Sequence, residues 1–282
     1  MSIWQAIILG IIQGLTEFLP ISSTAHLRII PAILGWDDPG SAFTAVIQIG
    51  TLGAVFIYFW KDILTIGTAS LQGVAKRNLF YNQDATLGFM IVIGTIPIVL
   101  AGLLFKKQID TTLRSLYIIS SALIVLALLL WLAEQLLAKK LKAGVELKSL
   151  ASLDWKTGFL IGLAQCIALI PGSSRSGVTI TAGLYLGLSR ETAARYSFLL
   201  SLPSVFAAGI YQLYKERESL LHSSENITAL VIATVVSGVV GYLSIAFLIQ
   251  FLKTRTTLVF VGYRLFIGFG LLILLSFGTL QP

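Results

Sequence analysis

Six apolar stretches of the chain are each long enough to cross a lipid bilayer as a helix, which takes about 20 residues. They lie near residues 42–60, 86–105, 115–137, 196–214, 227–252 and 257–279. Because only helices and closed barrels span a membrane, this pattern predicts an all-α polytopic membrane protein with one membrane domain over residues 1–282.

Two further apolar regions, residues 3–34 and 157–188, have a different pattern. Each is interrupted at its centre by proline, glycine or a run of hydroxyl residues, so each half has only about 13–17 residues, which is short for a crossing. Broken backbone at membrane depth is tolerated only where protein or water surrounds it. We therefore expect two re-entrant helical hairpins in addition to six transmembrane helices.

The two interrupted regions resemble each other. Both contain Gly-x-x-Gln, an apolar run and then Pro-x-Ser-Ser, in GIIQGLTEFLPISSTA (residues 10–25) and GLAQCIALIPGSSRSG (residues 162–177). Chance similarity between apolar sequences is the alternative, but the breakers, the hydroxyl residues and the following span recur in the same order. The pattern predicts an internal duplication with approximate halves at residues 1–137 and 157–279, and aligning the prolines places Arg175 opposite Thr24.

Three predicted spans separate the hairpins, so the second copy should be inverted relative to the first. Loops on one side of the membrane carry 12 Lys and Arg residues, and loops on the other side carry five. Cytoplasmic loops are the richer in basic residues, so we expect both termini outside and the first hairpin entering from outside. Inverted repeats with broken helices that meet near the midplane are one way to build a site inside a membrane.

The composition agrees with a membrane protein. Hydrophobic residues make up 56% of the chain and charged residues 12%, against about 25% charged in a typical soluble domain. The net charge of +7 is assigned to cytoplasmic loops, and no nucleic acid partner is expected.

Polar residues at the centre of the first hairpin are candidates for chemistry, because a charge inside a bilayer costs about 2.5–3.5 kcal/mol on insertion scales. Gln13 and Glu17 are four residues apart and share one helix face. Ser23 and His26 are close enough for a hydroxyl–imidazole hydrogen bond, the minimal activated nucleophile. The alternatives are that the hydroxyls, Ser22 above all, only cap a helix and that His26 is a satisfied core residue.

The centre of the second hairpin, PGSSRSGVT (residues 171–179), is a Gly/Ser-rich turn around Arg175. Backbone N–H groups where such a turn begins a helix bind anions, and the planar arginine fork suits phosphate. The alternative is a buried ion pair between Glu17 and Arg175, which is costly to bury. The spacing favours an anion, and the membrane setting favours a lipid phosphate.

A divalent metal, Mg²⁺ or Ca²⁺, is compatible with these residues. Glu17 could hold an ion that also contacts phosphate oxygens, with phosphate and water completing the coordination. Two more ionisable residues, Arg28 and Arg264, lie in or beside apolar segments. Arg264 either reaches the site or extends its side chain to the membrane interface, and we expect the latter.

Residues 13–26, QGLTEFLPISSTAH, resemble the first signature of the undecaprenyl-diphosphate phosphatases, also called bacitracin-resistance proteins, and PGSSRSGVT resembles the second. The resemblance extends nearly end to end. It implies an enzyme that hydrolyses undecaprenyl diphosphate to undecaprenyl phosphate and phosphate, recycling the lipid carrier of cell-wall synthesis and conferring bacitracin resistance. It also implies a divalent metal and a site that opens to the outer side of the bacterial inner membrane. The expected partners are a polyprenyl diphosphate and membrane lipid, and a homodimer is allowed.

The resemblance assigns roles to single residues. Glu17 and Gln13 match the acidic, metal-binding motif, in which some members have Glu at the position of Gln13. Ser23 and His26 match the presumed nucleophile and acid/base, and Arg175 matches the phosphate-binding arginine. The expected supporting contacts to the substrate are Ser22, Thr24, Ser173, Ser174 and Ser176.

Two mechanisms stay open. Ser23, deprotonated by His26, attacks the terminal phosphorus, or His26 is itself the nucleophile. The rival function is transport, because inverted repeats with midplane charges are also typical of transporters and would suit a lipid-phosphate flippase. The Ser–His pair favours the enzyme, since a transporter needs no nucleophile.

Overall fold

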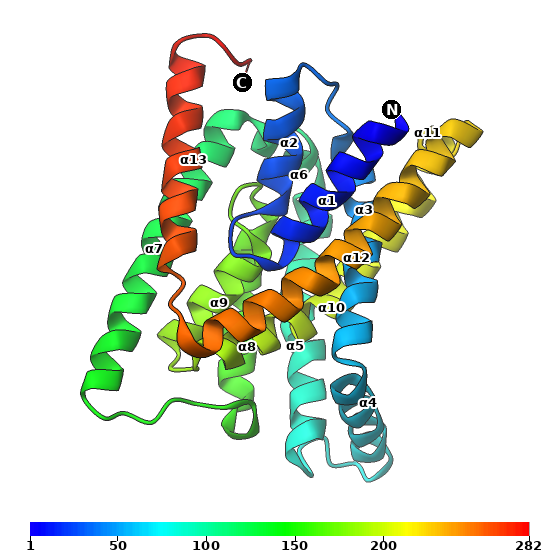
Figure 1. The fold of residues 1–282 in the computed structure, drawn as a ribbon. Helices are drawn as coiled ribbons and strands as arrows, with labels where there is room; N and C mark the ends of the chain where they lie inside the picture. The colour runs from blue at the N-terminus through cyan, green and yellow to red at the C-terminus, as the bar shows by residue number, and fades with distance from the viewer. Residues whose placement is uncertain (282) are drawn as a thin grey trace.

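The computed structural model describes residues 1–281, apart from the side chain of Asp110. The described chain is helical, and its single bridge between extended segments joins Lys148 and Leu188. The α-helices are α1 (Ile3–Phe18), α2 (Ser23–Leu34), α3 (Gly40–Tyr58), α4 (Trp60–Ala75), α5 (Gln83–Leu104), α6 (Lys106–Asp110), α7 (Leu116–Lys142), α8 (Trp155–Ala164), α9 (Arg175–Tyr185), α10 (Arg190–Lys215), α11 (Arg217–Leu220), α12 (Ser224–Thr254) and α13 (Leu258–Ser276). Short 3₁₀ turns are η1 (Thr112–Arg114), η2 (Leu150–Ser152) and η3 (Gln165–Leu169). The predicted all-α fold is confirmed (Figure 1).

Six of these helices are long and apolar enough to cross a membrane, namely α3, α5, α7, α10, α12 and α13. They coincide with the six predicted spans within a few residues at most ends. Several begin at a polar residue that accepts a hydrogen bond from the first turn: Asn82 caps α5, Ser115 caps α7, Ser189 caps α10 and Ser223 caps α12. The prediction of a multi-pass membrane protein is therefore confirmed.

The two interrupted regions fold back on themselves. Helix α1 has 16 residues, about 24 Å of helix, which is too short for a hydrocarbon core of about 30 Å. It turns at residues 19–22 into α2, and both outer ends of this pair lie at the end of the molecule that also holds the C-terminus (Figure 1). The second pair, α8–η3 and α9, begins and ends near Lys148, which binds Asp154 before α8 and pairs with Leu188 after α9.

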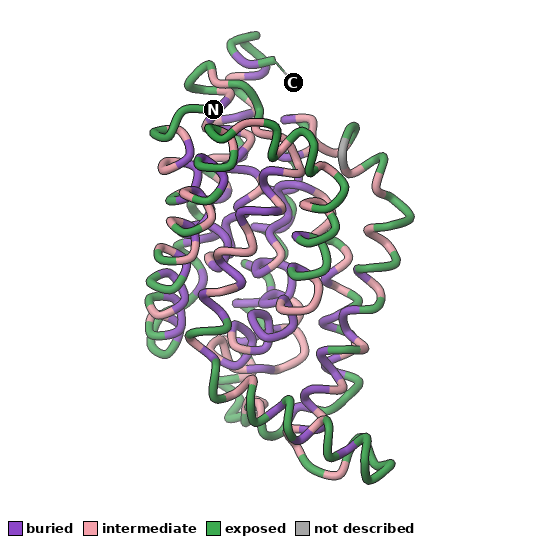
Figure 2. The backbone as a smooth tube through the Cα atoms, turned by 90° about the vertical axis from the view of Figure 1, so that its right-hand side faces the viewer, coloured by how far each residue is buried: buried purple, intermediate pink, exposed green. Residues whose placement is uncertain are grey.

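Each hairpin packs on a long helix from the other half of the chain. Helix α1 lies along α12, and α8 lies against α5. Glycines make these approaches close: a Cβ added at Gly14 would lie 2.8 Å from the backbone nitrogen of Gly241, and one added at Gly162 would overlap Gly94. The two halves are therefore interleaved in one body, and buried residues run along the interior helices (Figure 2).

A buried carboxylate holds three of the long helices together at the end opposite the termini. Glu134 of α7 accepts hydrogen bonds from Arg190 at the start of α10, the shortest at 2.6 Å. Its other oxygen accepts from the backbone and the hydroxyl of Thr257, both at 2.8 Å, directly before α13. This network sets where α13 begins and hence which of its residues reach the hairpins.

Candidate active site

The turns at the centres of the two hairpins have the same unusual backbone. Ser22 has φ 76° and ψ 98°, and Ser174 has φ 69° and ψ 114°. Each is the N-cap of the following helix and accepts a hydrogen bond from the amide three residues on. A positive φ is uncommon outside glycine, so its recurrence at equivalent points supports the internal duplication, which stays a prediction.

This shared geometry changes the alignment of the two tips. If Ser22 is equivalent to Ser174, then Arg175 is opposite Ser23, and the expected match of Arg175 with Thr24 is one residue out. Aligning the prolines gives the wrong register because the second region has one residue fewer than the first between its glutamine and its proline. The first residue of α2 is thus a serine, and the first residue of α9 is an arginine.

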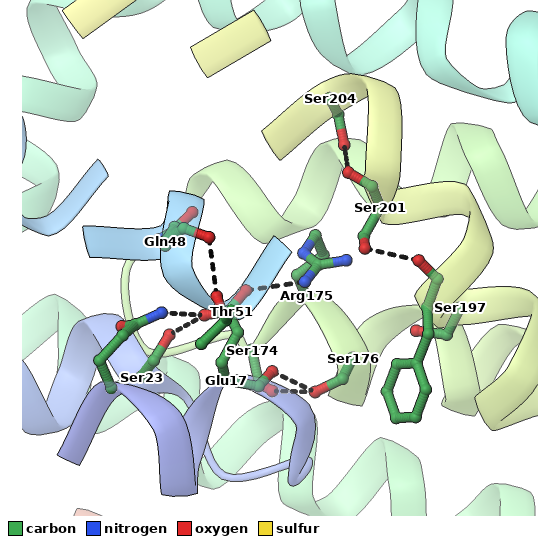
Figure 3. A network of polar contacts seen from close by, with 12 residues as sticks. Glu17, Ser23, Gln48, Thr51, Ser174, Arg175, Ser176, Ser197, Ser201 and Ser204 are labelled. Carbon is green, nitrogen blue, oxygen red and sulfur yellow. Dashed lines mark hydrogen bonds and ion pairs between the residues drawn. The ribbon is translucent and has the colours of Figure 1, made fainter. Parts of the chain in front are cut away.

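Glu17 lies where the two tips meet (Figure 3). Its Oε2 atom accepts hydrogen bonds from Ser23 Oγ at 2.6 Å and from Gln13 Nε2 at 3.0 Å. Its Oε1 atom accepts from Arg175 Nη2 at 2.7 Å. The structure therefore brings Gln13, Glu17, Ser23 and Arg175 together, and it contains the Glu17–Arg175 ion pair that the sequence analysis considered as an alternative.

Arg175 keeps one donor unused in this arrangement. Its Nη1 atom is buried and has no hydrogen-bond partner among the described residues. A buried guanidinium nitrogen without a partner is unfavourable, so the ion pair with Glu17 does not satisfy this side chain. The free nitrogen is a donor suited to an anion that shares Arg175 with Glu17.

The serines of the second tip mostly hold the two turns in place. Ser173 donates to the carbonyl of Ile170 at 2.6 Å, and Ser176 donates to the carbonyls of Glu17 and Leu19 at 3.3 and 3.1 Å. Of the predicted contacts to a substrate, Ser22, Thr24 and Ser174 line the adjacent cavity, whereas Ser173 and Ser176 do not.

His26 points away from Ser23. Its Nδ1 atom lies 2.7 Å from the carbonyl oxygen of Ser22, and its Nε2 atom lies 2.8 Å from the hydroxyl of Tyr263 on α13. The expected hydrogen bond between Ser23 and His26 is not among the contacts of either side chain, because the imidazole projects from another face of α2. Glu17 takes the place next to the Ser23 hydroxyl that the sequence analysis had assigned to His26.

A cavity of about 460 Å³ opens from the two tips. Its base contains Glu17, Ser23 and Arg175, and its walls are mainly apolar residues of α5 and α10. Polar residues of the cavity that the sequence analysis did not single out are Gln48, Lys106, Ser204, Tyr211 and Gln212. Gln48 could have been recognised from the sequence, because it is a lone amide in an apolar span. Lys106 and Tyr211 could not, because they resemble ordinary residues at the end of a helix.

Arg264 joins both tips to α7. Its side chain is fully buried, so the expected extension to the membrane interface is wrong. It donates to five backbone carbonyls, those of Pro20, Ala122, Leu123, Gly172 and Ser173. The close fit extends to Gly177, where an added Cβ would lie 2.8 Å from Arg264 Nη1. Arg28, in contrast, pairs with Asp38 at 3.5 Å in a partly exposed position.

The residues around Glu17 fit a divalent cation in part. The described residues contain no group of three or more His, Cys, Asp or Glu side chains arranged to hold a metal. However, Gln13 Oε1 is buried without a hydrogen-bond partner among the described residues, and it belongs to the side chain that contacts Glu17. An amide oxygen, a carboxylate and the Ser23 hydroxyl are the oxygen donors that Mg²⁺ and Ca²⁺ prefer, provided that substrate and water complete the set.

The fold and these contacts define a multi-pass membrane protein with a polar site between two broken hairpins. Residues 6–270 match the Bacitracin resistance protein BacA family, and the chain belongs to this family, as the two motifs predicted.

Curated relatives cover the whole chain. The undecaprenyl-diphosphatase of Chlorobium phaeovibrioides (strain DSM 265 / 1930) is 64% identical over 282 residues, which is 100% of both chains. The undecaprenyl-diphosphatase of Chloroherpeton thalassium (strain ATCC 35110 / GB-78) is 62% identical over 281 residues, 100% of this chain and 99% of the relative. That of Prosthecochloris aestuarii (strain DSM 271 / SK 413) is 61% identical over 281 residues and 100% of both chains.

Proposed function

We propose that this protein is an integral-membrane phosphatase that hydrolyses undecaprenyl diphosphate to undecaprenyl phosphate and inorganic phosphate. Its family and its full-length relatives, which are named undecaprenyl-diphosphatases, support this function. The observation that supports this chemistry is the position of Glu17 between a hydroxyl and a guanidinium. Its Oε2 atom lies 2.6 Å from Ser23 Oγ, and its Oε1 atom lies 2.7 Å from Arg175 Nη2. The reaction would recycle the lipid carrier of cell-wall synthesis and confer bacitracin resistance.

The reaction uses Ser23 as the nucleophile and Glu17 as the base. Glu17 accepts the Ser23 proton as Ser23 Oγ attacks the terminal phosphorus, and the anhydride bond breaks to release undecaprenyl phosphate. Glu17 passes this proton to the departing undecaprenyl phosphate. Water then attacks the phosphoserine and gives a proton to Glu17, which returns it to Ser23 Oγ as inorganic phosphate leaves, and this restores the Ser23 hydroxyl. Glu17 is preferred over His26 as the base because the imidazole nitrogens contact Ser22 and Tyr263 instead.

Arg175 couples substrate binding to the base. Before substrate binds, the Arg175 guanidinium forms an ion pair with Glu17 at 2.7 Å. A terminal phosphate that binds Nη1 would share the guanidinium with Glu17, whose other oxygen already accepts a hydrogen bond from Ser23. The same fork then stabilises the charge on the phosphoryl oxygens, the main source of catalysis in phosphoryl transfer.

A divalent metal, Mg²⁺ or Ca²⁺, would be held by Glu17 and by Gln13 through its unpartnered Oε1 atom. When bound, it would neutralise charge on the diphosphate. Because this protein has Gln13 where some relatives have Glu, we expect weaker metal binding than a two-carboxylate site would give.

The site opens to the outer side of the bacterial inner membrane in this proposal. The loops on the other side carry the larger share of Lys and Arg, 12 against five, which favours a cytoplasmic location for them. The cavity reaches the C-terminal parts of α5 and α10, and these helix ends point to the side of the termini (Figure 1). The homodimer that the sequence analysis allowed stays a prediction.

Transport of a lipid phosphate is the second candidate, and one observation favours it. Another cavity, of about 500 Å³, lies at the opposite ends of α5 and α10, where it is lined by Gln83, Asp84, Glu191 and Thr192. Alternating access needs a route to one site from each side of the membrane, and cavities at the two ends of one helix pair are compatible with such routes. We prefer the enzyme because transport needs no nucleophile, whereas the Ser23 hydroxyl lies 2.6 Å from Glu17 and the full-length relatives are named undecaprenyl-diphosphatases.

Phosphate release from a prenyl diphosphate by the purified protein in detergent tests the proposed function. We expect release of inorganic phosphate with Mg²⁺ or Ca²⁺, loss of release with EDTA, and recovery when either ion is added back. Release that EDTA does not reduce would contradict the metal assignment. Absence of release with both ions present would contradict the phosphatase and favour transport.

Replacing Arg175 by lysine tests its phosphate contact. Lysine keeps the charge but loses the planar fork, so we expect kcat/KM to fall by about 100-fold. The control is Arg114→Lys, which makes the same change in a guanidinium that pairs with Asp38 outside the site and should leave kcat/KM within about twofold. Equal activity of the Arg175→Lys protein and the wild type would rule out recognition by the fork.

A further inference from the structure

His26 is held from two sides. A carbonyl oxygen only accepts hydrogen bonds, so the contact with Ser22 requires a proton on Nδ1 of His26. Neutral His26 then has a lone pair on Nε2, which accepts from the Tyr263 hydroxyl. The two rings are also nearly parallel, with centroids 5.6 Å apart and an angle of 12° between their planes. These contacts select one tautomer and one orientation of the imidazole.

The carbonyl that His26 binds belongs to the strained turn before the nucleophile. Ser22 is in the left-handed region with φ 76°, and the next residue, Ser23, directs its hydroxyl to Glu17. The helical hydrogen bond from the His26 amide to the Ser22 carbonyl is long, at 3.3 Å, whereas the imidazole lies at 2.7 Å from the same oxygen. The imidazole is therefore the closer partner of this carbonyl.

The second tip provides an internal comparison. Its turn at Ser174 has nearly the same φ and ψ, but Val178 stands at the position equivalent to His26. There the helical bond from the Val178 amide to the Ser174 carbonyl is 2.8 Å long, and no side chain is needed to make the turn. The imidazole is therefore not a requirement of the turn itself, and it is present only at the tip that carries the serine beside Glu17.

Tyr263 is well placed to hold the imidazole. It precedes Arg264, whose guanidinium binds the Pro20 carbonyl of the same tip, so α13 is docked against the first turn. The Tyr263 side chain is about 40% exposed on the outside of the bundle, while His26 behind it is buried. Among the described residues of the site, the polar contact of this tyrosine is the one that its hydroxyl makes with His26.

We propose that Tyr263 is a positioning residue for the phosphatase reaction: its hydroxyl holds His26 in the tautomer whose Nδ1–H binds the Ser22 carbonyl, and this contact aims Ser23 at Glu17. The proposal rests on the proposed function in that Ser23 is taken as the nucleophile. Tyr263 acts through His26 and Ser22 and does not contact the substrate. Loss of its hydroxyl should therefore lower kcat and leave KM nearly unchanged.

The experiment uses Tyr263→Phe, which removes the hydroxyl and keeps the ring. The chain has two histidines, so protein labelled with ¹⁵N-histidine in a His222→Gln background reports His26 alone. In the parent protein we expect one tautomer, with Nδ1 protonated and Nε2 an acceptor. In Tyr263→Phe we expect the Nε2 resonance to move and the second tautomer to appear, together with a fall in kcat of about tenfold and a KM within about twofold.

The matched control is Tyr242→Phe. Tyr242 is also about 40% exposed on a membrane helix, and its ring contacts the ring of Tyr58 rather than His26. This control should change neither the His26 resonances nor kcat.

Two results would overturn the proposal: unchanged His26 resonances in Tyr263→Phe, or shifted resonances with a kcat equal to that of the parent. A parent protein that releases no phosphate would instead contradict the proposed function. The spectra need no turnover, so they would still support or overturn the contact between Tyr263 and His26.

Discussion

Replacing Ser23 by alanine is expected to lower kcat by at least about 1000-fold, the effect of losing a nucleophile. The reason is that the Ser23 hydroxyl lies 2.6 Å from Glu17 Oε2 at the base of the cavity, where proton transfer and attack on phosphorus are both within reach. The measurement is steady-state phosphate release, with thermal unfolding to confirm that the variant is folded.

The matched control for this change is Ser244→Ala. Ser244 is a buried serine of α12 that donates to Val240 of its own helix, and its loss should leave kcat within about twofold. Brief reaction with ³²P-labelled prenyl diphosphate, followed by acid quench, identifies the nucleophile, because phosphoserine survives acid and phosphohistidine does not. Full activity of Ser23→Ala, or label lost in acid, would exclude the serine route and favour His26 as the nucleophile.

Replacing Arg264 by methionine is expected to destabilise the protein by about 3–5 kcal/mol, because each buried acceptor left without its donor costs about 1–3 kcal/mol. The guanidinium donates to carbonyls of both tips and of α7, and methionine would leave these groups with fewer donors in a buried site. A loss of this size should lower Tm by about 10 °C in a chain of this length. Tryptophan fluorescence during heating in detergent, at one scan rate, measures the change.

Arg255→Met is the control for Arg264→Met, because Arg255 follows α12 in an exposed position and should shift Tm by no more than about 2 °C. Arg264→Lys should rescue little, since one ammonium group cannot span carbonyls from three segments. A Tm for Arg264→Met within 2 °C of the wild type would show that these carbonyls do not depend on the guanidinium.

The membrane spans and the hairpins were predictable because their signals are local. Length and apolarity alone mark a helix that crosses a bilayer, and all six such helices were found close to the predicted positions. Pro20 and the Pro171–Gly172 pair end short helices through their own backbone limits. Gln13 and Glu17 lie four residues apart on one helix, so their contact also followed from spacing.

The partners of Ser23, His26 and Arg264 could not be predicted in the same way. Spacing of three residues allows Ser23 to meet His26, but the positive φ at Ser22 and the neighbours on α13 and α1 decide which way each side chain points. Arg264 lies more than 80 residues from either tip in sequence, and an arginine that snorkels and one that is buried occur in similar apolar segments.

The sequence by itself determined the class of protein, the family, the two hairpins and the set of polar residues at their centres. Helix length, chain breakers and motif order each depend only on residues that are neighbours along the chain. Only the tertiary structure decided which of those residues touch. Glu17 meets Ser23 and Arg175, and His26 meets Tyr263, because these contacts depend on how α1, α2, α9 and α13 pack against each other. That packing is set by glycine contacts and buried carbonyls that are distant along the chain.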